Sequence, residues 1–128
     1  MGANKEKYKL EHLLKFQNTC ALSLWYLIQD TNIKSFHYNI NDLNFFIREY
    51  RSSTPNYFPQ LFKKCAESHG YVDIFLSNGN NGFNFKINTT YFKVKIFMRQ
   101  MEKIFVINIY KVYKINIVYR LGTIQAYN

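Results

Sequence analysis

The chain of 128 residues is poor in cysteine, glycine and proline, and these shortages exclude several protein classes. Its two cysteines, Cys20 and Cys65, have no Cys or His partner at metal-ligand spacing, so we expect neither a disulfide framework nor a zinc site. The five glycines form no Gly-rich phosphate-binding loop. No Pro/Gly/Ser-rich linker or internal repeat divides the chain, which predicts a single domain over residues 1–128.

Acidic residues are also scarce, at 8 against 17 basic ones. The carboxylates Asp42, Asp73 and Glu102 lack the spacing of a metal-binding pair. The three histidines are scattered, and none lies in a nucleophile motif with Cys, Ser or a carboxylate. We therefore predict no catalytic residues, no metal and no cofactor.

No apolar run is long enough to cross a bilayer. The longest one near the N-terminus, residues 21–28, is interrupted by Ser23, whereas a spanning helix needs about 20 residues. The run lies too deep in the chain and lacks the cleavage site of a secretory signal. We expect a cytoplasmic protein without a membrane partner.

Basic residues are abundant, and the formal net charge of +9 at pH 7 suits a polyanionic partner. Phe, Tyr, Asn, Ile and Lys, which AT-rich codons favour, make up 64 of the 128 residues, so codon bias supplies part of the lysine. Placement is more informative, because residues 1–90 carry a net charge of +3 and residues 91–128 carry +6. Codon bias alone does not explain this concentration in the C-terminal third.

Two kinds of periodicity predict an α+β fold. Between Lys5 and about Asp30 a broad apolar face without Gly or Pro predicts a long helix. After residue 90 the period changes from 3.6 to 2, which is typical of strands. We predict strands over residues 91–99, 104–110 and 113–120, with a break at 121–123 before a short tail. Helices (5–90) followed by a basic antiparallel β-meander (91–128) are the expected organisation.

Residues 35–88 carry signals for a strand, a helix, a turn, a helix and a hairpin, in that order. Helical spacing runs from Leu43 to Tyr50, and a second amphipathic run, Asn56 to Ser68, is stopped by Gly70. The predicted strands are 35–38, 71–76 and 83–88, with a turn at 77–82. This order resembles that of winged-helix DNA-binding domains.

The resemblance implies a recognition helix over residues 56–68 and a wing at the hairpin turn. Its implied DNA-contacting residues are Asn56, Gln60, Lys63 and Lys64 on the helix, and Asn78, Asn80 and Asn81 at the wing tip. It also requires Pro59 to lie in the first helical turn, because a later proline would break the helix. The alternative is a helix pair that only buries Phe46, Phe58 and Phe62 in a core.

A second candidate surface lies in the predicted strand 91–99. Lys93, Lys95 and Arg99 share one face with Tyr91 and Phe97. Such cations could neutralise phosphates while the aromatic rings stack on exposed bases, as in proteins that bind single strands or RNA. The alternative is a solvated strand face in an AT-rich gene.

The leading functional hypothesis is a small basic nucleic-acid-binding protein. It is a DNA-binding regulator of an AT-rich bacterial or phage genome, with duplex DNA favoured and single strands or RNA as other ligands. An alternative is a non-enzymatic phage or mobile-element accessory protein that binds and inhibits a host protein such as a defence complex. A third is a toxin-like ribonuclease that uses Arg99, Arg120, Tyr113 and Tyr119.

Overall fold

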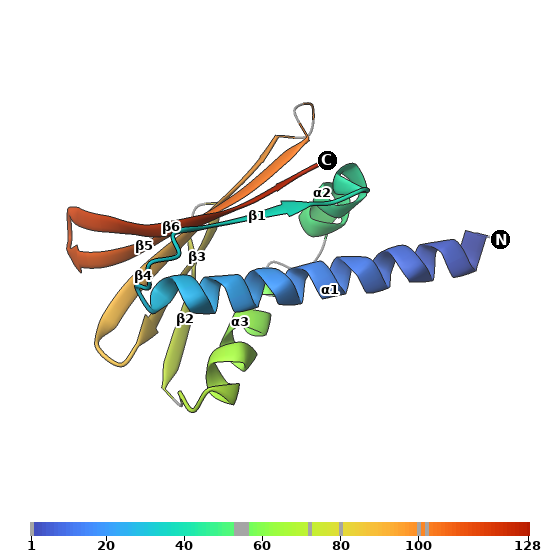
Figure 1. Ribbon diagram of the computed structural model, residues 1–128. Coiled ribbons are helices and arrows are strands. Elements are labelled where there is room, and N and C mark those ends of the chain that lie inside the picture. Colours follow the sequence, from blue (N-terminus) through green and yellow to red (C-terminus); the bar gives the residue numbers. More distant parts are fainter. Residues whose placement is uncertain (1, 53–56, 72, 80, 100, 102) are drawn as a thin grey trace.

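The computed structural model describes residues 2–52, 57–71, 73–79, 81–99, 101 and 103–128 (Figure 1). Their elements are α1 (Gly2–Ile28), β1 (Ser35–Asn39), α2 (Leu43–Ser52), α3 (Tyr57–Ser68), β2 (Ile74–Gly79), β3 (Gly82–Ile87), β4 (Thr90–Arg99), β5 (Ile104–Lys114) and β6 (Ile117–Tyr127). The three helices gather on one side of a six-stranded sheet. A mixed α+β fold with strands in the C-terminal part is therefore confirmed.

The sheet has the order β1-β6-β5-β4-β3-β2. Strands β2 to β6 form an antiparallel meander, whereas the sequence predicts a meander only over residues 91–128 and a separate hairpin before it. Strand β1 joins the far edge by pairing in parallel with β6, from Ser35 opposite Thr123 to Asn39 opposite Tyr127. The first and the last of these strands in the sequence, β1 and β6, therefore lie side by side, with β1 at the edge.

The winged-helix unit is not confirmed, although its helices and strands form close to their predicted positions. Strand β1 and the β2–β3 hairpin lie at opposite edges of the sheet. The hairpin is also no separate wing, because β4 continues it along residues 90–95. Sequence signals for these elements are local, whereas sheet order depends on pairing between distant segments.

Several strand boundaries predicted from the sequence were wrong. The expected strand 71–76 and turn 77–82 are displaced, because β2 runs from Ile74 to Gly79 and β3 begins at Gly82. The expected strand 113–120 contains a turn, because β5 ends at Lys114 and β6 begins at Ile117. The expected break at 121–123 lies inside β6. Gly122 is buried there, and a Cβ on it would lie 2.6 Å from Leu27 Cδ2 and from the Lys34 carbonyl oxygen. This glycine permits close packing of α1 on the strand and does not end it.

The helices cover the sheet with aromatic side chains. The Phe46 ring of α2 lies 4.9 Å from that of Phe105, and the Phe62 ring of α3 lies 4.5 Å from that of Phe85. Phe46, Phe58 and Phe62, the residues expected in the core of the helix pair, are buried together with Leu24, Trp25 and Ile47, whereas Leu61 is half-buried. Pro59 is the third residue of α3, within its first turn as required.

Helix α1 is one continuous helix of 27 residues and packs along the sheet beside α3. It buries the polar side chain of Ser23, whose hydroxyl donates to the Thr19 carbonyl oxygen at 2.9 Å and lies 2.5 Å from the Tyr38 hydroxyl. This contact ties α1 to β1. In the described part of the chain, no helix combines the length and apolarity needed to cross a membrane.

Candidate nucleic-acid interface

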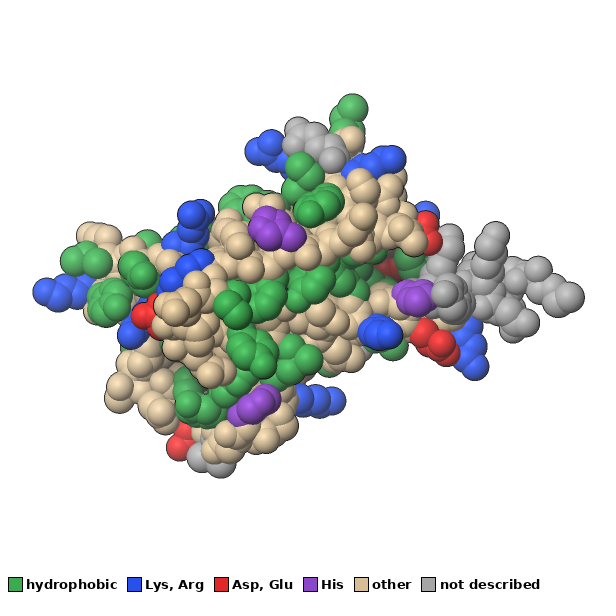
Figure 2. Space-filling model, viewed as in Figure 1, with side chains coloured by type: hydrophobic (Ala, Val, Ile, Leu, Met, Phe, Trp, Pro, Cys, Tyr) green, Lys and Arg blue, Asp and Glu red, His purple; other side chains and the backbone are tan. Residues whose placement is uncertain are grey.

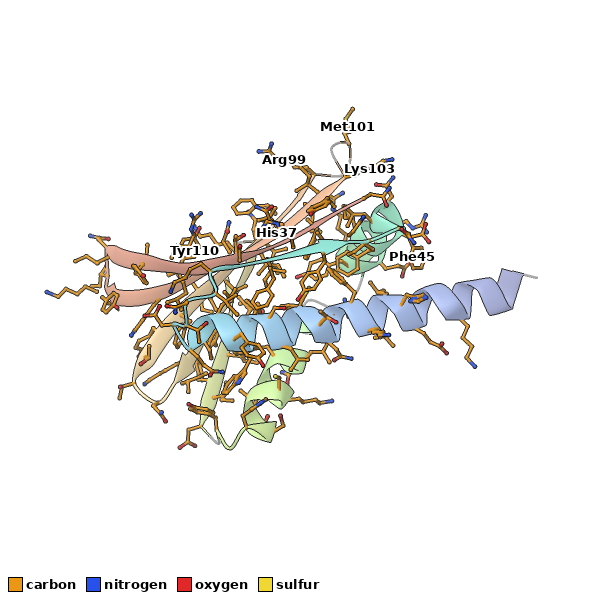
Figure 3. The ribbon with its side chains drawn as sticks, in the orientation of Figure 1. His37, Phe45, Arg99, Met101, Lys103 and Tyr110 are labelled. Carbon is orange, nitrogen blue, oxygen red and sulfur yellow. The ribbon has the colours of Figure 1, made fainter. Side chains whose placement is uncertain are left out.

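The sheet has one face against the helices and one that carries no described helix. Along β4 the buried residues Phe92, Val94 and Ile96 point to the helices. The exposed residues that alternate with them are Tyr91, Lys93, Lys95, Phe97 and Arg99. We call the side of the sheet that bears these five residues the open face. Figure 3 shows Arg99, Tyr110 and His37 on this side, away from α1.

Neighbouring strands add further side chains to the open face. Across β5, Tyr110 lies opposite Lys93 and Asn108 lies opposite Lys95. On β3, Lys86 lies opposite Tyr91. Because paired residues in antiparallel strands point to the same side, cations and aromatic rings here form a continuous surface over three strands.

Two cation–π contacts position lysines on this surface. Lys86 Nζ lies 5.1 Å from the centre of the Tyr91 ring, and Lys95 Nζ lies 6.0 Å from that of Tyr110. From Gly82 to the C-terminus the sequence has one acidic residue, Glu102, in the β4–β5 connection. The open face therefore has a positive potential that suits phosphate groups.

The open face continues to the β1 edge of the sheet, where it ends in the polar residues Gln125 and His37. His37 of β1 lies opposite Gln125 of β6. Gln125 in turn lies opposite Val106 of β5, and Val106 lies opposite Phe97 of β4. The sequence did not single out His37 or Gln125, and it missed Lys86 and Tyr110 as well. Alternation in β5 would have found Tyr110, but residues 104–110 are almost all apolar and hide it.

The helical candidates lie on the other side of the sheet. Helix α3 buries Phe58 and Phe62 against Phe83 and Phe85, so its outward side faces away from the open face. On α3, Gln60 and Lys64 are exposed and Lys63 is half-buried. The structure thus brings Lys93, Lys95 and Arg99 together and separates them from Lys63 and Lys64.

The predicted wing tip is a tight turn between β2 and β3. Asn81 is exposed there with a φ of 56°, and its carbonyl oxygen accepts a hydrogen bond from the Ile96 amide at 2.6 Å. Asn78 is exposed in β2 beside this turn. The start of α3 and this end of β2 enclose a cavity of about 230 Å³, lined by Pro59, Gln60, Leu76, Ser77 and Asn78. The predicted contacts Asn56 and Asn80 lie outside the described residues.

The residues considered for ribonuclease chemistry do not converge. Tyr113 and Tyr119 are close, with ring centres 6.5 Å apart, and Arg120 lies opposite Tyr110. Arg99 lies opposite Ile104, six residues from Tyr110 along β5, which is roughly 20 Å.

Other ionisable groups are dispersed as well. His69 stacks on Trp25 at 4.7 Å, and His12 lines a cavity of about 470 Å³ between α1 and α2. Burial raises the pKa of the Cys20 thiol well above its usual range, so this side chain is a neutral part of the core. In the parts of the chain with assigned positions, no group of His, Cys, Asp and Glu could hold a metal ion.

Comparison with protein families, curated proteins and solved structures finds no match to this chain. The open face holds two cation–π pairs, Lys86 with Tyr91 and Lys95 with Tyr110, on three neighbouring strands.

Proposed function

We propose that the protein binds nucleic acid through the open face of its sheet. The observation that carries the proposal is the exposed row Tyr91, Lys93, Lys95, Phe97 and Arg99 along β4. Phosphate neutralisation by lysine and arginine supplies most of the affinity of non-specific nucleic-acid binding. A regulator or another nucleic-acid-handling protein of an AT-rich bacterial or phage genome is the role that fits this ligand.

Single strands fit this surface better than a duplex. Tyr91 is 53% exposed and Phe97 is 46% exposed, so Phe97 offers open ring surface to an unpaired base and Tyr91 offers it beside Lys86 Nζ. They are six residues apart along β4, or roughly 20 Å, a distance that several nucleotides of an extended strand can span. In a duplex the base faces are already stacked on one another, and these rings would find no partner.

A salt titration with matched charge removal tests the proposal. Binding of fluorescent single-stranded DNA, single-stranded RNA and duplex DNA is measured by anisotropy over a range of salt concentrations. Lys93→Ala with Lys95→Ala should lower the slope of log affinity against log salt by about 1.4 on single strands, close to 0.7 for each lost phosphate contact. Tyr91→Ala with Phe97→Ala should weaken binding by about 1–3 kcal/mol per stacked base.

Lys63→Ala with Lys64→Ala is the matched control, because it removes the same charge from α3 on the other side of the sheet. Its slope should stay close to that of the unsubstituted protein. Equal losses in both lysine pairs would show that the open face has no special role. Absence of binding at low salt would reject the proposal and favour a protein that inhibits a host protein.

Duplex DNA on α3 and the β2–β3 turn, the winged-helix mode, is the second candidate. It is favoured by one observation: Gln60 of α3 and Asn78 beside the turn, two of the implied DNA-contacting residues, line the same surface pocket. This mode predicts the reverse pattern, with duplex binding lost in the Lys63 and Lys64 variant and retained in the Lys93 and Lys95 variant.

A further inference from the structure

The β5–β6 hairpin projects beyond the helices and exposes apolar side chains. It forms the end of the molecule at the left of Figure 1, where Figure 2 shows hydrophobic and basic side chains gathered. We call residues 113–120 the β5–β6 tip, and all eight are exposed. Its large apolar members are Tyr113 (59% exposed), Ile115 (93%), Ile117 (53%), Val118 (48%) and Tyr119 (45%). Such a cluster is costly in water unless a partner covers it.

The apolar side chains lie on both faces of the hairpin. Val112 pairs with Val118, and the next pair toward the sheet is Lys111 with Tyr119. Successive pairs in a ladder point to opposite faces, so Val118 and Tyr119 project in opposite directions. A groove on a partner protein covers one face of a hairpin, whereas a lipid surface surrounds the hairpin on all sides.

Charge on the hairpin has one sign. Lys114 and Arg120 belong to the tip, and Lys111 at its base holds its Nζ 5.1 Å from the centre of the Tyr113 ring. The sequence has no acidic residue after Glu102. Cations beside an apolar apex complement a surface of anionic headgroups over hydrocarbon.

We propose that the β5–β6 tip inserts into the interface of an anionic lipid surface. Ile115 and Ile117 enter the boundary between headgroups and acyl chains. Tyr113 and Tyr119 lie at headgroup level, where tyrosine rings are favoured. The long side chains of Lys111, Lys114 and Arg120 extend to the phosphates.

The length of the hairpin fits this arrangement. From Tyr119 to Ile117 strand β6 advances by two residues, which is roughly 7 Å, while β5 opposite it has a bulge between Val112 and Lys114. Interfacial segments bury their apolar side chains about 5–10 Å into the headgroup and acyl boundary. The tip can therefore insert without moving the sheet, and the open face stays outside the lipid.

Vesicle sedimentation tests the proposal with the full chain. The unsubstituted protein should pellet with vesicles of phosphatidylcholine and phosphatidylglycerol, and much less with phosphatidylcholine alone. Ile115→Asn with Ile117→Asn should lower the partition coefficient by about tenfold or more, since burial of one isoleucine contributes about that much. Both side chains are exposed, so folding should be retained, which circular dichroism checks.

Met101 supplies the matched control, because it is 98% exposed at the other end of β5. Met101→Asn should pellet like the unsubstituted protein, and tryptophan emission should shift to the blue on vesicles for Ile115→Trp but not for Met101→Trp. Equal pelleting of the tip and Met101 variants, or no pelleting of the unsubstituted protein at low salt, would overturn the proposal. Loss of single-strand binding in the tip variant with unchanged pelleting would assign the tip to nucleic acid.

Discussion

At the scale of single residues, aromatic side chains divide into those that hold the helices on the sheet and those that remain exposed. Phe62 has no exposed surface, and its ring centre lies 6.3 Å from that of Phe83 and 4.5 Å from that of Phe85. Phe75 of β2 is 66% exposed although it has the same chemistry. Position and not residue type therefore decides how much each phenylalanine contributes to stability.

Phe62→Ala should lower the free energy of unfolding by about 3–5 kcal/mol, because it removes a buried ring and leaves a cavity between α3 and β3. Phe75→Ala should change it by about 0.5 kcal/mol or less, as for an ordinary surface substitution. Urea denaturation followed by circular dichroism measures both values. Similar values for the two variants would mean that α3 does not pack on the sheet as described.

At the scale of elements, the turns determine which parts of the strands are exposed. The sequence predicts strand 113–120 as one alternating segment, whereas a turn after Lys114 places its apolar residues in water at the β5–β6 tip. In the β2–β3 turn, Asn81 has a φ of 56°, in the left-handed region. Asparagine tolerates that region better than other residues with a Cβ, and glycine adopts it freely.

Asn81→Ala should destabilise the protein by about 1–2 kcal/mol, the cost of a left-handed alanine. If only the exposure of the Asn81 side chain mattered, Asn81→Ala would leave the stability of the protein unchanged. Asn81→Gly is the control, since it keeps the backbone conformation and the hydrogen bond from the Ile96 amide to the residue 81 carbonyl. Thermal and denaturant unfolding compare the two variants, and an alanine variant as stable as the glycine variant would contradict the positive φ.

At the scale of the whole molecule, β6 joins segments that lie far apart in the sequence. Its residues pair with β5 on one side and with β1 on the other, so that Ile124 lies opposite both Ile107 and Phe36. Ile124 has no exposed surface. The sequence predicts a break at 121–123 and a short tail after it, whereas in the structure these residues belong to the strand that connects residues 35–39 to the meander.

Ile124→Ala should cost about 2–5 kcal/mol, because it leaves a cavity between three strands and the helices. Ile117→Ala, in the same strand but 53% exposed, should cost less than about 1 kcal/mol. Chemical denaturation measures the difference. If Ile124→Ala left the stability nearly unchanged, the C-terminal residues would be a tail, as the sequence predicts.

The sequence by itself determined the helix and strand types and the inward side of the helices. Helical spacing marks Phe46 and Phe62 as inward residues, and alternation marks Lys93 and Lys95 as neighbours on one strand face. These inferences succeed because the period of 3.6 or 2 is a property of neighbouring residues.

Only the tertiary structure decided how these faces combine. Parallel pairing of β1 with β6 moves the first strand away from the β2–β3 hairpin, and the packing of α3 separates Lys63 and Lys64 from the β4 cations. Neither follows from local periodicity, because both depend on contacts between residues far apart in the chain. The role of Gly122 was hidden for the same reason. In the sequence, a glycine that ends a strand looks the same as a glycine that lets a helix pack closely on the strand. The structure distinguishes the two cases, because a Cβ on Gly122 would lie 2.6 Å from Leu27 Cδ2.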